Sequence, residues 1–95
     1  MSLAARTAML RRMVAEGARI SWEYPHAQER ARERCIPKFL AERVLRTGEV
    51  RAVRSPGTSR ERWRVVGRPD NERELIVVIA LGRDGVLRVV TVFDK

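Results

Sequence analysis

The sequence is short of the residues that build disulfides and metal centres. Among 95 residues it has one cysteine, Cys35, and one histidine, His26. A single cysteine cannot form an intrachain disulfide, and its ordinary place is a buried position. One cysteine and one histidine cannot supply the ligands of a metal site. The chain also lacks a glycine-rich phosphate loop and a Gly-x-Ser-x-Gly motif, so we expect neither a metal nor another cofactor.

Long hydrophobic runs are also absent. The longest uncharged apolar run, Leu75 to Gly82, is far shorter than the roughly 20 residues that span a bilayer. The first residues mix arginines with apolar residues and have neither the apolar core nor the cleavage site of a signal peptide. We therefore expect a cytoplasmic protein without a membrane partner. A chain of this length is expected to form a single domain over residues 1–95.

Positive charge is abundant. The 20 Lys and Arg residues outnumber the 12 Asp and Glu residues, which leaves a formal net charge of +8. Such a charge on a small domain attracts polyanions, and the release of counterions drives their binding. Most of the basic residues are arginine, which grips phosphate in a bidentate manner, although a GC-rich genome also raises arginine content. The composition favours a nucleic acid or an acidic protein as partner.

Apolar spacing and proline positions predict three helices in the first half of the chain. Residues 2–17 carry an apolar stripe at helical spacing, which we expect to pack on the core and not to bind a partner. The stripe consists of Leu3, Met9, Leu10, Met13 and Val14. Residues 18–22 are long enough only for a short edge strand. Proline in a first helical turn predicts a second helix from Pro25 to about Arg34 and a third from Pro37 to Thr47.

The second half is predicted to form an antiparallel sheet. Strands are expected at residues 49–54 and 60–68, and Asp84-Gly85 joins two β-branched runs in a strong hairpin signal. Residues 75–81 are apolar at every position, which is typical of a strand in the middle of a sheet. The predicted fold class is α+β, with N-terminal helices packed on one face of a C-terminal antiparallel sheet.

Three-residue loops at 69–71 and 83–85 would set the register of this sheet. One face is then expected to be the core, with Trp63, Thr91 and Phe93 on it. The other face is expected to combine a basic strand with an uncovered apolar centre. That centre comprises Ile76, Val78, Val90 and Val92. Arginines at spacing two on this face can line a groove for a phosphate backbone, or they can protect an edge strand from aggregation.

A series of short motifs resembles a known family. These motifs are His26-Ala27-x-x-Arg30, Arg34-x-Ile36, Gly48-Glu49-Val50, Val66-Gly67-Arg68 and a terminal Val-Val-Thr-Val-Phe. In this order they resemble a domain-of-unknown-function family near the BrnT and RelE-type toxins. The opening Leu-Arg-Arg-Met-Val-Ala-Glu-Gly is similar to the start of the MqsR toxin. The resemblance implies a RelE-like (BECR-like) fold. It also implies a toxin-like RNA-binding protein, in its finer form a metal-independent endoribonuclease (mRNA interferase) neutralised by a protein antitoxin.

The resemblance also implies roles for individual residues. Arg62 lies where BrnT-like chains have an arginine before an aromatic residue, and Arg88 and Thr91 fall on their Arg-Ile-Ile-Ser. The arginines that follow in those chains have no counterpart here, so His26 or Lys95 is expected to move the proton. The catalytic candidates are therefore His26, Arg62, Arg88 and Lys95. The RNA-binding candidates are Arg30, Arg34, Arg60, Arg64 and Arg68.

Two alternatives stay open at this point. His26 also suits a structural role at a helix start, with its ring bonded to backbone. The whole protein also suits a non-catalytic module that binds a protein partner, or a second copy as a homodimer, through the basic and apolar sheet face. One feature separates enzyme from module, because an enzyme needs His26 or Lys95 within reach of the arginines.

Overall fold

The computed structural model describes residues 1–95, with three helices and a five-stranded sheet. The elements are α1 (Leu3–Ala15), β1 (Ile20–Ser21), α2 (Pro25–Glu33), α3 (Lys38–Thr47), β2 (Glu49–Arg54), β3 (Arg62–Gly67), β4 (Leu75–Leu81) and β5 (Leu87–Asp94). The predicted α+β class, with helices first and the sheet after, is confirmed. The sheet is mixed and not purely antiparallel, because the short β1 pairs with β5 in parallel. No helix combines the length and the hydrophobicity needed to cross a membrane.

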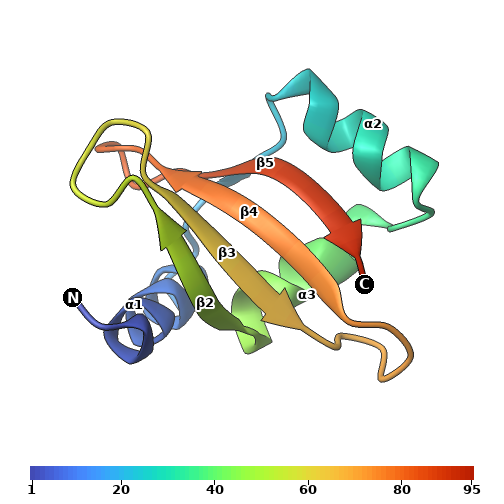
Figure 1. The fold of residues 1–95 in the computed structure, drawn as a ribbon, viewed down its shortest axis with the longest axis horizontal. Coiled ribbons are helices and arrows are strands. Elements are labelled where there is room, and N and C mark those ends of the chain that lie inside the picture. Colours follow the sequence, from blue (N-terminus) through green and yellow to red (C-terminus); the bar gives the residue numbers. More distant parts are fainter.

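The sheet has the strand order β1-β5-β4-β3-β2, so β4 lies in the middle as its apolar sequence predicts. Helices α1 and α3 pack behind this sheet, and α2 lies beside β5 (Figure 1). The opposite face of the sheet, which Figure 1 presents to the viewer, has no helix over it. We call it the open face. It is built mainly from side chains of β2, β3, β4 and β5.

Helix α2 and the turn after it explain the position of the only cysteine. Pro25 occupies the first turn, where its missing N–H costs nothing, and Ala27 and Ala31 form the buried side as expected. Cys35 follows the helix in a left-handed conformation with φ 53° and is exposed. The expected buried thiol is therefore wrong. The left-handed turn points Cys35 outward and places Ile36 in the core instead.

The core lies between the helices and the covered face of the sheet. It joins 18 buried residues into one cluster. Leu10, Val44 and Leu45 contribute from the helices, and Val65 and Val77 from the middle of the sheet, all fully buried. Burial of each such side chain favours folding by about 1.5–3 kcal/mol. The predicted core position of Trp63 is confirmed, with 3 % of its surface exposed.

The predicted faces hold for one hairpin, and the predicted register fails halfway along the other. In the β3–β4 pair Trp63 lies opposite Ile79, whereas the three-residue loop would have placed it opposite Val77. A shift of two residues leaves each side chain of β3 and β4 on its expected face. In the β4–β5 pair Ile79 lies opposite Val89, as expected, but the next residue, Val78, lies opposite Thr91. Val90 is therefore an extra residue in β5, a β-bulge.

The bulge moves the end of β5 to the opposite faces of the sheet. Val92 pairs with Val77 and is buried in the core, with 1 % exposure. Thr91 and Phe93 consequently lie on the open face. The prediction that they face the core is wrong, because a shift of one residue exchanges the two faces of a strand.

Helix α1 contacts less of the core than predicted. Leu10 is fully buried, and Met13 and Val14 are half-buried against the core cluster. Leu3 and Met9 remain exposed, with 42 % and 40 % of their surface accessible. The helix lies at the β2 edge of the sheet and contacts β2 and α3 (Figure 1), so only a narrow side of it reaches the core. The expectation that the whole apolar stripe packs is therefore wrong at these two residues.

Candidate nucleic-acid interface

Strand pairing brings arginines of two neighbouring strands together on the open face. Arg54 of β2 lies opposite Arg62 of β3, and Ala52 lies opposite Arg64. On the other side of β3, Arg64 lies opposite Val78 of β4, which in turn lies opposite Thr91 of β5. The arginines of β2 and β3 thus border a narrow apolar strip on β4 and β5.

A pocket lies where this strip meets the arginines. Its lining residues are Ala52, Arg54, Arg62, Arg64, Val78 and Phe93. The guanidinium carbon of Arg64 lies 5.0 Å from the centre of the Phe93 ring, in the range of a cation–π contact. Both side chains are half-buried. The pocket therefore combines positive charge with an aromatic ring.

No carboxylate neutralises this cluster. Arg54, Arg62 and Arg64 form none of the ion pairs of the molecule. Directly opposite like charges on paired strands, as in Arg54 and Arg62, destabilise a sheet. The arrangement is therefore a local cost to stability that a bound anion would remove.

The acidic residue nearest in sequence, Glu61, makes other contacts. Its two carboxylate oxygens accept hydrogen bonds from the backbone N–H of Gly57 and from the indole N–H of Trp63, each at 2.8 Å. The hydrogen bond from Gly57, and to a smaller extent the one from Trp63, lowers the pKa of Glu61. Its charge is thus used to hold the 55–61 loop against Trp63.

Arg88 lies on the same face, opposite Ala80, but is neutralised. Its Nη2 lies 2.7 Å from Oδ2 of Asp84, and its Nη1 donates to Oδ1 at 3.2 Å. These hydrogen bonds lower the pKa of Asp84 to about 2, and the same contact raises the pKa of Arg88. Arg88 therefore forms a closed pair with a carboxylate of its own hairpin.

Lys95 and Arg68 lie at the other end of the sheet. Both contact Glu74, with nitrogen–oxygen distances of 3.5 Å for Lys95 and 3.8 Å for Arg68. Lys95 follows Asp94, which pairs with Leu75 of β4. Arg62 precedes Trp63, which pairs with Ile79, so Arg62 lies level with Ala80 of β4. Five residues of strand separate the two levels, or about 16 Å. The structure does not bring Lys95 to the arginine pocket.

The candidates on α2 lie beyond the β5 edge. His26 is highly exposed, and its Nδ1 lies 3.7 Å from Oε2 of Glu29, with no hydrogen bond from its ring to backbone. Arg30 is exposed and has no ion-pair partner, whereas Arg34 contacts Asp94 at 3.2 Å. Arg60 is exposed in the loop before β3 and is not part of that strand. Only Arg62 and Arg64 of the nine predicted site residues line the pocket.

Two pocket residues were missed from the sequence. Arg54 ends a predicted strand, and its antiparallel pairing with β3 would have placed it beside Arg62. Phe93 was assigned to the core, because nothing in a run of similar β-branched residues marks Val90 as the bulge.

Comparison with known proteins gives the chain a family. A family model called DUF4258, a domain of unknown function, matches residues 24–94. The chain belongs to the DUF4258 family. The DUF4258 match takes in α2, α3 and the strands β2 to β5, and therefore the whole arginine pocket. No curated protein and no solved structure matches the chain.

Proposed function

We propose that this DUF4258 protein is a toxin-like RNA-binding protein that holds single-stranded RNA on the open face of its sheet. The observation that carries the proposal is the pocket in which Arg54, Arg62 and Arg64 converge on one side of Phe93 without a neutralising carboxylate. The net charge of +8 supports the same class of partner.

The arginines suit a phosphate backbone. Arg54 and Arg62 face each other on paired strands, so a phosphate between them would replace repulsion by two charge-assisted contacts. Arg64 lies on the next row of the same strand and extends the positive surface along β3. Such contacts position a nucleic acid without reading its sequence.

The aromatic ring favours a single strand. Unpaired bases of RNA stack on aromatic side chains and on arginine planes, whereas the bases of a duplex are covered by their neighbours. Phe93 and Arg64 already contact each other in this way, and Thr91 adds a hydroxyl nearby on the same face. The pocket thus offers one base a stacking surface beside phosphate-binding groups.

Cleavage is the finer hypothesis. The resemblance to BrnT and RelE-type toxins supports a metal-independent endoribonuclease with a protein antitoxin, and this chemistry requires an acid and a base at the reacting phosphate. His26 lies on α2 beside Glu29, and Lys95 lies about 16 Å along the strands from Arg62. This geometry favours binding by the arginine pocket over cleavage through these two residues. Cleavage remains a prediction with a separate test.

A homodimer through the open face has less support. Val92 faces the core, and Ile76, although on the open face, is only 1 % exposed. Val78 and Phe93 are half-buried there, and the exposed large hydrophobic residues lie elsewhere, in the N-terminal segment, at Tyr24 and at Phe39. Little apolar area is therefore available there for a second copy.

Binding of a labelled single-stranded RNA in EDTA tests the proposal. We expect the parent protein to retain the RNA and the double variant Arg62→Ala/Arg64→Ala to release it. The matched control is Arg12→Ala/Arg19→Ala, which removes the same charge from two exposed arginines without ion pairs elsewhere on the surface. Equal losses in both double variants would show attraction by net charge alone and would contradict the proposed site.

The same reactions test cleavage. Fragments that form in EDTA with the parent but not with His26→Ala or Lys95→Ala would establish a ribonuclease and identify its proton-transfer group. Intact RNA that is nonetheless retained would leave an RNA-binding protein without this activity.

A further inference from the structure

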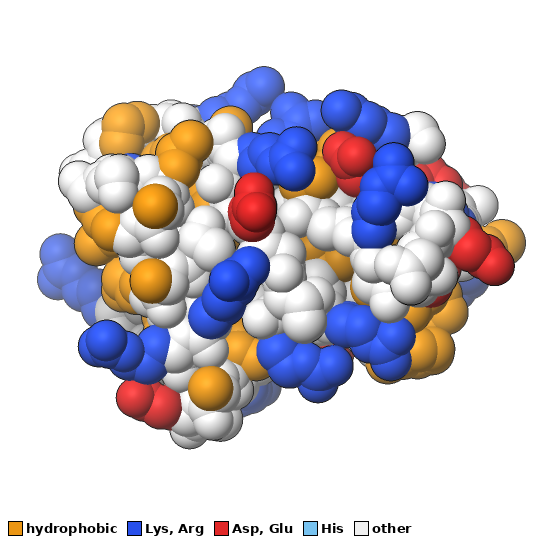
Figure 2. All heavy atoms as spheres, turned by 90° about the horizontal axis from the view of Figure 1, so that it is seen from below, with side chains coloured by type: hydrophobic (Ala, Val, Ile, Leu, Met, Phe, Trp, Pro, Cys, Tyr) orange, Lys and Arg blue, Asp and Glu red, His pale blue; other side chains and the backbone are white.

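Helix α1 exposes an apolar side that nothing in the chain covers. Beside the exposed Leu3, this side carries small residues, among them the exposed Ala4 and Ala8. Seen from below, hydrophobic side chains gather on the side of the molecule where α1 lies, with Lys and Arg around them (Figure 2). Small side chains on an exposed helix allow another element to approach its backbone closely.

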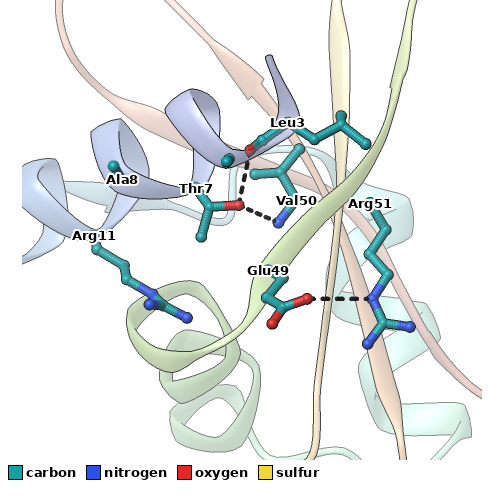
Figure 3. Close-up of a pocket in the computed structure, with 8 residues that line it drawn as sticks. Leu3, Thr7, Ala8, Arg11, Glu49, Val50 and Arg51 are labelled. Carbon is teal, nitrogen blue, oxygen red and sulfur yellow. Dashed lines mark hydrogen bonds and ion pairs between the residues drawn. The ribbon is translucent and has the colours of Figure 1, made fainter.

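A groove runs between this helix and the edge strand β2 (Figure 3). Leu3, Thr7 and Ala8 line it from the helix, and Val50 lies in its floor. Its volume is about 560 Å³, room for several side chains of a partner. The groove is therefore the largest hollow beside the exposed apolar surface.

The backbone at the start of β2 is already capped by α1. The hydroxyl of Thr7 accepts a hydrogen bond from the N–H of Val50 at 2.9 Å (Figure 3). Arg11 donates to the carbonyl oxygens of Thr47 and Gly48, each at 3.0 Å. A partner strand cannot form ladder bonds with groups that are occupied in this way. At this end of β2 the occupied groups favour a partner that binds through side chains, as a helix does.

The charged residues of the groove indicate whether a partner should be acidic or basic. Arg11 and Arg51 extend from its two walls in the same direction (Figure 3), and Arg12 is exposed on the same helix. The only carboxylate in the lining, Glu49, lies 3.7 Å from Arg51. The lining is thus apolar on the helix side and keeps a net positive charge, because Arg11 has no carboxylate partner while Arg51 is paired with Glu49.

A second copy fits these charges poorly. Helix α1 carries Arg6, Arg11 and Arg12 against one acidic neighbour, Glu16, so two such helices would bring like charges together. Each copy also carries a net charge of +8. A negatively charged partner has the opposite balance.

We propose that the groove between α1 and β2 binds an acidic amphipathic helix of another protein. Its apolar residues would pack on Leu3 and Ala8, and its carboxylates would meet Arg11 and Arg51. The proposal concerns a different surface from the RNA pocket and does not depend on RNA binding.

A peptide selection tests it. A displayed library of random 16-residue peptides is selected on the parent protein, and the enriched peptides are synthesised and measured by fluorescence anisotropy. We expect them to combine apolar residues at helical spacing with Asp and Glu. Ala8→Glu should weaken their binding by about tenfold or more, because it places a carboxylate in the groove.

Ala15→Glu is the matched control. It makes the same substitution at an exposed alanine of the same helix outside the groove, and its effect should stay below about twofold. Arg62→Ala/Arg64→Ala should bind the peptides as the parent does. Circular dichroism checks that both glutamate variants fold.

Several results would overturn the proposal. These are failure to enrich any peptide, enriched peptides without an excess of acidic residues, equal binding to Ala8→Glu and the parent, or loss of binding in Arg62→Ala/Arg64→Ala. A homodimer of the parent that dissociates in Ala8→Glu would assign the groove to a second copy instead.

Discussion

The two sides of the open face hold similar numbers of basic side chains, but these are unpaired on one side and paired with carboxylates on the other. On β2 and β3, Arg62 and Arg64 have no carboxylate partner and share a pocket with Phe93. On and beside β5, Arg88 is held by Asp84 and Lys95 by Glu74. The first side presents free positive charge to solvent, whereas the second presents neutral pairs.

The difference shows that the position of an arginine on a face does not decide its role. Arg62 and Arg88 flank the same small residue of β4, Ala80, and both were expected to act on RNA. Only the one without a carboxylate partner retains its full attraction for phosphate, because an ion pair must break before its guanidinium can bind elsewhere. The comparison predicts that RNA binding depends on the β2–β3 side.

The largest expected effect is on RNA affinity. Arg62→Ala/Arg64→Ala should lower it about 100-fold, since hydrogen bonds to charged groups contribute about 1.5–3 kcal/mol each. Arg88→Ala/Lys95→Ala, which removes the same charge from the paired side, should lower it less than about threefold. Filter binding at one salt concentration measures both. Similar losses in the two variants would remove the distinction between the sides.

The bulge that brings Phe93 to the pocket predicts a difference in stability. Val92→Ala should lower the free energy of unfolding by about 2 kcal/mol, because it leaves a cavity in the core. Val90→Ala, at the half-buried bulge, should cost less than about 0.5 kcal/mol. Urea unfolding of both variants checks this. Equally small costs in both variants would mean that β5 keeps the register without a bulge, with Val90 and Val92 on the open face and Phe93 facing the core.

Removal of the aromatic ring should have a smaller effect on binding. Phe93→Ala is expected to weaken single-stranded RNA binding about tenfold, within the range of about 1–3 kcal/mol for stacking of one base. Phe39→Ala is the control, because Phe39 is 62 % exposed on α3 and lies outside the pocket. Anisotropy titrations with a uridine oligonucleotide give both values. No loss in Phe93→Ala would leave the arginines as the whole site.

The smallest expected effect is a gain. Asp84→Asn should free Arg88 and raise RNA affinity about two- to fivefold, whereas Glu16→Gln, an equal charge change on α1, should raise it less. The pKa of Asp84 is lowered from 3.8 to about 2. The ion pair between Asp84 and Arg88 is therefore fully formed above pH 3.8 and is lost as the pH falls toward 2. Binding by the parent should accordingly show no release of Arg88 between pH 7 and pH 5. An unchanged affinity in Asp84→Asn would mean that Arg88 lies out of reach of the RNA.

Much of this fold could be predicted from the sequence. Proline at helix starts located α2 and α3, and the apolar run of β4 placed it in the middle of the sheet. The faces of β3 and β4 were also predicted correctly. The actual loop between these strands is four residues longer than predicted, but an even difference leaves every side chain on its predicted face. These features follow from local chemistry.

The site was less predictable, because it depends on tertiary pairing. The bulge at Val90 lies among valines and a threonine, and no local signal distinguishes it from its neighbours. The Lys95–Glu74 contact depends on the register beyond that bulge. The exposure of Leu3 and Met9 depends on where α1 docks, and periodicity alone cannot give this position.

An NMR titration of the isotope-labelled protein with a uridine oligonucleotide tests the central claim most directly. We predict that the largest backbone amide shifts fall on β3 at Arg62 to Arg64 and on β5 at Thr91 to Phe93, and that they weaken as salt concentration rises. Shifts confined to α2, around His26 and Arg30, would contradict the account, because they would place the RNA beyond the β5 edge and away from the arginine pocket.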